Sequence, residues 1–190
     1  LVILGAFMLI PFFVQFIYHE QNSTFISSAI ITNFIGVLLV LTNLEEEKRL
    51  NLQQAFLLTT LSWLSIAIFG SIPFILSDLN LSFVDSFFES MSGITTTGST
   101  IITDLDNAPR GILIWRAILQ WLGGIGVIVM AITILPLLNV GGMQLFRMES
   151  SDTAEKILPK TREVTLMISV IYLSLTFACA IAYWLSLIHI

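Results

Sequence analysis

The amino-acid sequence predicts an all-α polytopic membrane protein, and two observations carry that prediction. Apolar residues make up 56% of the 190 residues and charged residues only 11%, whereas soluble domains carry roughly 25% charged residues. The few charges lie between uncharged runs long enough to cross a bilayer as helices, which takes about 20 residues. The net charge of −5 also argues against a nucleic-acid partner, because nucleic-acid-binding surfaces are basic.

Five apolar segments are predicted as membrane helices: residues 1–18, 21–44, 50–77, 111–146 and 164–190. The first has the length of a signal peptide, but it lacks a basic beginning and a small-residue cleavage site before His19, so it is predicted as a helix. The fourth contains Arg116 near its start, where a long side chain can reach the interface. It is also too long for the bilayer, so we expect a bend at Pro136 or at the Gly141–Gly142 pair.

The cations predict the orientation. Six of the eight Lys and Arg residues lie in the connections 45–49 and 147–163, and cytoplasmic connections are enriched in Lys and Arg. Those two connections and the N-terminus are therefore predicted to be cytoplasmic. Residues 19–23 and 78–110 are predicted to share the opposite side.

The segment 78–110 predicts a short helix that cannot span. Ser82 followed by Asp85 has the spacing of a capping box, with Asp where Glu or Gln is more usual. The apolar run behind it predicts a helix over residues 82–92 that stops at Gly93, because glycine is the common residue after a helix end. At 1.5 Å per residue this helix is about 16 Å long.

The next residues are Ile-Thr-Thr-Thr-Gly-Ser-Thr, positions 94–100. Non-helical backbone at membrane depth is tolerated only where protein packs around it or where it lines a water-filled cavity. Successive carbonyls of such a strand can replace the hydration shell of an alkali cation, and Gly98 can adopt the positive φ that this requires. A re-entrant pore loop and a packed Thr-rich turn both fit these residues.

The sequence Asp-Ser-Phe-Phe-Glu-Ser-Met-Ser-Gly-Ile-Thr-Thr-Thr-Gly-Ser-Thr at residues 85–100 resembles the first pore loop of the Trk/Ktr/HKT superfamily of potassium-uptake proteins. Gln-Trp-Leu-Gly-Gly-Ile-Gly at 120–126 and Gly-Gly-Met-Gln-Leu-Phe-Arg at 141–147 are similar to its Trk-type membrane subunits. In that family, four covalently linked helix–pore–helix repeats surround one pore.

The resemblance implies how the chain is organised. Residues 1–49 are expected to form a two-helix N-terminal region, 50–147 the first helix–re-entrant pore loop–helix repeat, 148–163 a cytoplasmic loop, and 164–190 the truncated first helix of a second repeat. Because the sequence opens without Met and stops inside an apolar run, we expect it to be an N-terminal fragment.

The resemblance also implies the site. The potassium selectivity filter would comprise Thr95, Thr96, Thr97, Gly98 and Ser99, and the carbonyls of Thr96, Thr97 and Gly98 would bind the ion. Plant relatives with Ser at the glycine position favour sodium, so Gly98 implies potassium. Glu89 is expected to brace the filter, and Asp104 and Asp106 to make a negative outer vestibule that concentrates cations.

The function implied by the resemblance is potassium uptake across the cell inner membrane by a multi-pass protein. The implied partners are the potassium ion as transported ligand, membrane lipid, a second copy in a homodimer and a cytoplasmic nucleotide-binding regulatory subunit. No covalent cofactor is expected. The sequence contains no catalytic arrangement, so an enzyme is not predicted. Two alternatives are a non-conducting membrane scaffold subunit and a homotetrameric cation channel with one pore loop per subunit.

Overall fold

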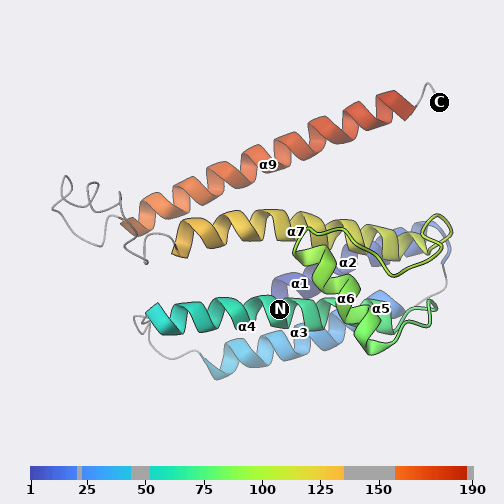
Figure 1. The fold of residues 1–190 in the computed structure, drawn as a ribbon, viewed down its shortest axis with the longest axis horizontal. Coiled ribbons are helices and arrows are strands. Elements are labelled where there is room, and N and C mark those ends of the chain that lie inside the picture. The colour runs from blue at the N-terminus through green and yellow to red at the C-terminus, as the bar shows by residue number, and fades with distance from the viewer. Residues whose placement is uncertain (21–22, 44–51, 135–156, 188–190) are drawn as a thin grey trace. The chain divides into compact units, whose positions relative to one another are not determined.

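The computed structural model describes residues 1–20, 23–43, 52–134 and 157–187, and these residues form helices and connecting loops without a strand (Figure 1). The chain divides into two compact units, Leu1–Gly124 and Ile125–Ile190. The first unit holds the predicted short helix and the loop after it. The all-α fold class predicted from the sequence is confirmed.

The first apolar segment forms two helices, α1 (Val2–Phe7) and α2 (Leu9–Ile17), instead of one. The interruption at Met8 lies one turn before Pro11, which has no N–H to donate to the carbonyl of Phe7. Both helices pack against α3 (Thr24–Thr42). The α1–α3 contact is close, since a Cβ on Gly36 would lie 2.8 Å from the backbone nitrogen of Val2.

A proline also divides the next segment. Helix α4 (Leu52–Gly70) is followed after Ser71 by the short helix α5 (Ile72–Ile75), with Pro73 in its first turn. Despite this break, residues Gln53–Ile75 remain long and apolar enough to cross a membrane.

Within the described residues, four helices are long and apolar enough to span a membrane: Thr24–Thr42, Gln53–Ile75, Arg110–Met130 and Glu163–Leu187. The sequence predicted five spans. The difference is the first segment, where α1 and α2 together cover Val2–Ile17, which is shorter than any of the four.

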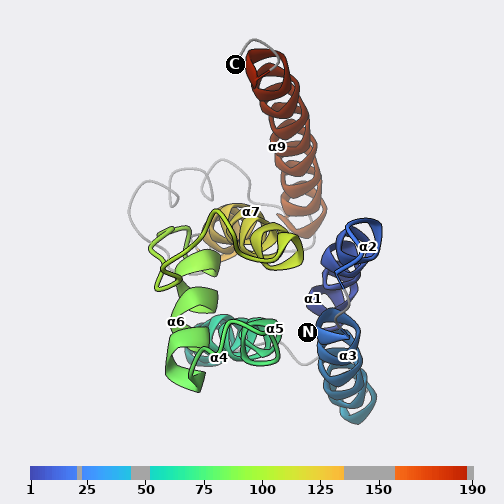
Figure 2. The ribbon, with the colours of Figure 1, turned by 90° about the vertical axis from the view of Figure 1, so that its right-hand side faces the viewer.

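Helix α6 (Phe83–Ile94) begins as predicted. The hydroxyl of Ser82 accepts a hydrogen bond from the backbone N–H of Asp85 (3.1 Å), and the Asp85 carboxylate accepts one from the N–H of Ser82 (3.3 Å). Figure 2 shows α6 running between α4–α5 on one side and α7 (Arg110–Ile134) on the other. The loop that follows α6 returns beside α7 towards the start of that helix (Figure 1).

The core of this unit forms around Trp115 on α7. Its ring is fully buried and meets the ring of Phe25 edge-on, with 6.2 Å between centroids. The indole N–H donates to the carbonyl of Gly70 at the end of α4 (2.9 Å). Because an indole N–H needs a partner when buried, this bond fixes α7 against α4 next to the loop.

Residues 19–23 and 78–110 were predicted to lie on the same side of the membrane. In the structure, Glu20 of the first connection contacts the start of α7, where the second connection ends. The carboxylate of Glu20 accepts hydrogen bonds from the backbone N–H groups of Arg110 (2.7 Å) and Gly111 (3.3 Å). A negative charge at the first N–H groups of α7 is favourable, since they carry the positive end of the helix dipole.

The second unit contains the end of α7 and helix α9 (Ile157–Leu187). Helix α9 begins seven residues before the predicted span at 164, within the segment that we expected to be a loop. The predicted bend at Pro136 or at Gly141–Gly142 lies outside the described residues.

Candidate functional site

The site is the end of α6 together with the return loop, defined here as residues 95–109. Helix α6 ends at Ile94, two residues beyond the predicted last residue, Ser92. Gly93 lies inside the helix and packs against α7: a Cβ there would lie 3.0 Å from the Cβ of Leu119. Small residues allow two helices to approach in this way.

The helix stop is made by Thr96. Its φ of +58° lies in the left-handed region, which is unusual for a β-branched residue. The N–H of Thr96 donates to the carbonyl of Gly93 (2.9 Å), and the N–H of Thr97 donates to that of Ser92 (3.0 Å). This pair of bonds is a Schellman motif, in which glycine usually takes the left-handed position.

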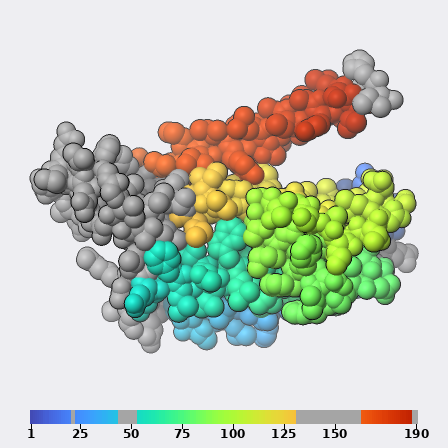
Figure 3. Space-filling view, viewed as in Figure 1, coloured from blue at the N-terminus to red at the C-terminus, as the bar shows by residue number. Residues whose placement is uncertain are grey.

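The predicted filter includes this turn and lies at the surface. Residues 95–100 are all exposed, and the space-filling view shows the segment around them, in green to yellow-green, uncovered on the side of the molecule drawn in Figure 3. Gly98 has a φ of +77°, as its predicted role requires. The hydroxyls of Thr95 and Thr97 lie 2.9 Å apart.

Four successive peptide oxygens in this turn lack a donor. Within the residues that the structure describes, no hydrogen bond is made to the carbonyls of Thr95, Thr96, Thr97 or Gly98. A backbone carbonyl is a strong acceptor that needs a partner. These oxygens are therefore available to water or to a cation.

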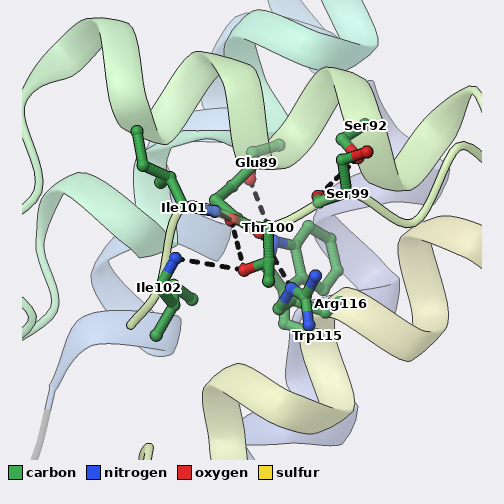
Figure 4. Close-up of polar contacts among 9 residues, drawn as sticks. Glu89, Ser92, Ser99, Thr100, Ile101, Ile102, Trp115 and Arg116 are labelled. Carbon is green, nitrogen blue, oxygen red and sulfur yellow. Dashed lines mark hydrogen bonds and ion pairs between the residues drawn. The ribbon is translucent and has the colours of Figure 1, made fainter. Parts of the chain in front are cut away.

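Ser99 differs from its neighbours. Its carbonyl accepts a short hydrogen bond of 2.6 Å from the hydroxyl of Ser92 on α6 (Figure 4). One of its two acceptor positions is thus occupied by the protein. Of the five predicted filter residues, Ser99 has the carbonyl that is least free to bind an ion.

Glu89 lies behind the return loop and holds it. Its side chain is completely buried, and Oε1 accepts hydrogen bonds from the Thr100 hydroxyl (2.6 Å) and the N–H of Ile101 (2.5 Å). The Thr100 hydroxyl in turn accepts one from the N–H of Ile102 (3.1 Å). Glu89 therefore ties α6 to the residues immediately after the predicted filter, and its role as a brace of the filter stays a prediction.

Arg116 occupies a different position from the one expected. Its Nε lies 2.8 Å from Oε2 of Glu89, and its side chain is only 13% exposed. The expectation that Arg116 reaches the membrane interface is therefore wrong. Burial of a carboxylate is costly unless a partner neutralises it, and Arg116 is that partner.

Gly123 allows α7 to approach the end of α6. A Cβ at Gly123 would collide with the carbonyl oxygen of Ile94 and lie 2.7 Å from its carbonyl carbon. Gln120, one turn earlier on α7, lies beside the glycine of the loop: its Nε2 would be 3.6 Å from a Cβ on Gly98. Helix α7 thus forms a surface on which the turn rests.

The two expected vestibule residues are exposed and lie farther along the return loop. Asp104 accepts hydrogen bonds from the side-chain amide of Asn107 (3.0 and 3.1 Å). Asp106 lines an open hollow of about 460 Å³ together with Glu20, Asp78 and residues 107–110. Among the described contacts, none joins Asp104 or Asp106 to residues 95–99. Their role in a negative outer vestibule stays a prediction.

The chain was compared with known proteins. The TrkH family, described as cation transport protein, matches residues 20–190. The TrkH potassium uptake protein of Vibrio parahaemolyticus is 40% identical over 190 residues, which cover 98% of this chain and 39% of that protein. The Trk system potassium uptake protein TrkI of Halomonas elongata is 42% identical over 184 residues, covering 96% of this chain and 37% of that protein.

A solved structure agrees with the fold. The crystal structure of the potassium transporter TrkH from Vibrio parahaemolyticus superposes with a TM-score of 0.84 at 37% identity, covering 97% of this chain and 37% of that one. The chain therefore spans less than two fifths of the length of the relatives it matches. With a family match over residues 20–190, the chain belongs to the TrkH family of cation transport proteins.

Proposed function

We propose that the complete protein takes up potassium ions across the membrane through a channel-like pore, and that residues 95–99 of this chain form one quarter of its selectivity filter. The carbonyls of Thr96, Thr97 and Gly98 are the proposed ligands, and the membrane potential drives uptake with about 2.3 kcal/mol per charge per 100 mV. The relatives named as Trk system potassium uptake proteins support this cargo.

The observation that carries the proposal is the row of unbonded carbonyls at residues 95–98 in the described structure. A potassium ion that leaves water needs oxygen ligands in place of its hydration shell, and stacked carbonyls supply them. In the described residues, no three His, Cys, Asp or Glu side chains are grouped as a metal site needs. Peptide oxygens are therefore the ligands that this part of the chain offers.

The proposal includes the setting of the complete protein. It is a multi-pass inner-membrane protein in contact with lipid, its N-terminus is cytoplasmic, and it works as a homodimer with a cytoplasmic nucleotide-binding regulatory subunit. The orientation is supported by the cations in the sequence and by the hydrogen bond that Glu20 accepts from Arg110, which joins two connections predicted to share the opposite side. Its role is transport without catalysis and without a covalent cofactor.

The substitution Gly98→Ser in the full-length protein tests the filter assignment. A side chain at this position meets only Gln120 at 3.6 Å, so there is room for it, but the φ of +77° is disfavoured by about 1–2 kcal/mol for a residue with a Cβ. The backbone should relax and turn the neighbouring carbonyls. We expect the preference for rubidium, used as a potassium tracer, over sodium to fall in uptake assays.

Asn80→Ser is the matched control. Asn80 also has a positive φ, of 52°, and is exposed in the loop before α6, so this variant likewise places a serine at a positive φ, but away from the turn. An unchanged ion preference in both variants would contradict the filter assignment. A scaffold function predicts that Gly98→Ala and Thr96→Ala change stability without changing ion flux.

A further inference from the structure

The two oxygens of the Glu89 carboxylate have separate partners. Oε1 accepts from the Thr100 hydroxyl and the Ile101 N–H, so it holds the chain just after the predicted filter. Oε2 accepts from Nε of Arg116 on the neighbouring helix α7. Figure 4 shows Glu89 on α6 with dashed lines to the loop residues and to Arg116.

The helix that carries Arg116 is itself fixed at this point. The adjacent residue, Trp115, is fully buried and its indole is bonded to Gly70 of α4. The guanidinium therefore projects from a rigid support towards a carboxylate with no solvent exposure. A charged pair in this setting keeps its geometry, because leaving either charge buried alone is costly.

We infer that Arg116 is a positioning residue of the selectivity filter, which acts through Glu89. It holds Oε2 of Glu89 in place, so that Oε1 stays oriented to fix Thr100 and Ile101. Those residues anchor the outer end of the segment that carries the unbonded carbonyls. The inference rests on the proposed function, since it assigns Arg116 a part in the selectivity of that same filter.

The same geometry has a consequence for charge. Because Glu89 is paired with Arg116 at 2.8 Å, the two side chains together add no net charge behind the filter. Glu89 thus contributes by holding the loop, and not by attracting cations. In this respect it differs from the exposed Asp104 and Asp106.

The test compares Glu89→Gln, Arg116→Gln and the double variant in the full-length protein. Glutamine at 89 keeps Oε1 as an acceptor for Thr100 and Ile101, but it places an amide N–H₂ towards the donating Nε of Arg116 and leaves that cation unpaired. Arg116→Gln leaves the carboxylate unpaired instead. In the double variant, the amide of Gln at 89 can donate to the amide oxygen of Gln at 116, so the neutral pair can re-form.

The measured quantity is the ratio of rubidium to sodium uptake in proteoliposomes, normalised to folded protein. A purely structural role would lower the amount of folded protein without changing this ratio. We expect the ratio to fall by about tenfold or more in each single variant, as truncation of one partner of a buried ion pair shifts equilibria by at least that factor. The double variant should recover most of the ratio.

Arg110→Gln is the control for loss of a cation. Arg110 is exposed at the start of α7, where its guanidinium lies 5.8 Å from the centre of the Tyr18 ring. The uptake ratio should not change in this variant. If Arg110→Gln changes the ratio as much as Arg116→Gln does, the loss of any cation has this effect and the inference about Arg116 is overturned.

The outcomes separate the inference from the proposed function. A normal ratio in folded Arg116→Gln, with an altered ratio in Gly98→Ser, would overturn the role of Arg116 and leave the filter assignment standing. A normal ratio in Gly98→Ser as well would overturn both the role of Arg116 and the filter assignment. If the single variants do not fold, the double variant decides: a folded protein with a normal ratio supports the inference, and one with a lost ratio overturns it.

Discussion

The contact between Gly123 on α7 and Ile94 at the end of α6 gives a sharp prediction for Gly123→Ala. The added methyl would collide with the carbonyl oxygen of Ile94 and lie 2.7 Å from its carbonyl carbon and 3.2 Å from its Cα. All three atoms belong to the backbone, so no rotation of a side chain relieves the overlap. The end of α6 must move away from α7.

The magnitude follows from these contacts. The 2.7 Å contact must lengthen by roughly 1 Å to reach the ordinary carbon–carbon separation of about 3.5–4.0 Å. Overpacking costs about 1–3 kcal/mol, and a rigid backbone neighbour places Gly123→Ala at the upper end. Alanine regains about 1 kcal/mol through helix propensity, so we expect a net loss of about 2 kcal/mol in the free energy of unfolding.

The displacement should also affect transport, because Ile94 directly precedes the predicted filter. Thermal unfolding in detergent would report the stability of the full-length protein, and the rubidium-to-sodium uptake ratio would report the geometry of the loop. Gly93→Ala is the matched comparison at the same interface. Its methyl would lie 3.0 Å from the Cβ of Leu119, so a shift of a few tenths of an ångström suffices and both losses should be smaller.

Wild-type stability together with a wild-type uptake ratio in Gly123→Ala would refute this reasoning. Such a result would mean that α6 and α7 are not in backbone contact at this point in the complete protein. A loss of stability with a normal ratio would confirm the contact, but would separate it from the position of the loop.

Three further substitutions test local features, each by the free energy of unfolding of the full-length protein. Ser82→Ala removes the cap of α6 and should cost about 1 kcal/mol; no loss would contradict the capping box. Thr96→Gly relieves the left-handed backbone and should stabilise by about 1 kcal/mol, whereas a net loss would show that the threonine side chain outweighs the backbone strain. Trp115→Phe leaves the buried Gly70 carbonyl without its indole donor and should cost about 1–3 kcal/mol, a result that an unchanged stability would disprove.

The sequence predicted the features that depend on local chemistry. Long uncharged runs predicted the helices, and the Ser82–Asp85 spacing predicted the start of α6 correctly. The positive φ at Gly98 was also expected from the residue type. Each of these follows from a property of neighbouring residues that needs no knowledge of tertiary contacts.

The features that the sequence analysis missed depend on neighbours distant in the chain. Gly93 looked like a helix stop, but its hydrogen is needed where α6 packs on Leu119. The stop fell instead on Thr96, a residue type that disfavours the left-handed conformation. Local propensity favours glycine at that position, and so it does not predict a stop at threonine.

The ion pair of Arg116 with Glu89 is the clearest feature that the sequence analysis missed. As a lone cation inside an apolar segment, Arg116 suggested an interfacial side chain, and Glu89 was considered separately as a lone carboxylate. Two opposite charges in neighbouring apolar segments are expected to form an ion pair, because each charge would otherwise be buried without a partner. That signal was present in the sequence, and only the partner assignment required the structure.

The distribution of hydrogen bonds around the turn explains how free carbonyls can be kept in place. On the N-terminal side of these carbonyls, the carbonyl oxygen of Ser92 accepts hydrogen bonds from the N–H groups of Thr97 (3.0 Å) and Gly98 (3.3 Å). After them, the Ser99 carbonyl is bonded to Ser92 and the Glu89 carboxylate holds residues 100 and 101. The donors and flanks of the segment are thus fixed, while the oxygens of residues 95–98 remain without a described partner.

This division is what an ion site needs. If the oxygens were bonded to protein donors, an incoming cation would have to break those bonds. If the residues on either side of the segment were loose, ion binding would have to order the loop at a cost in conformational entropy. Fixing the segment through its N–H groups and its ends avoids both costs. Ion preference should therefore be as sensitive to the surrounding groups, such as Glu89, Arg116 and Gly123, as to the threonines of the proposed filter.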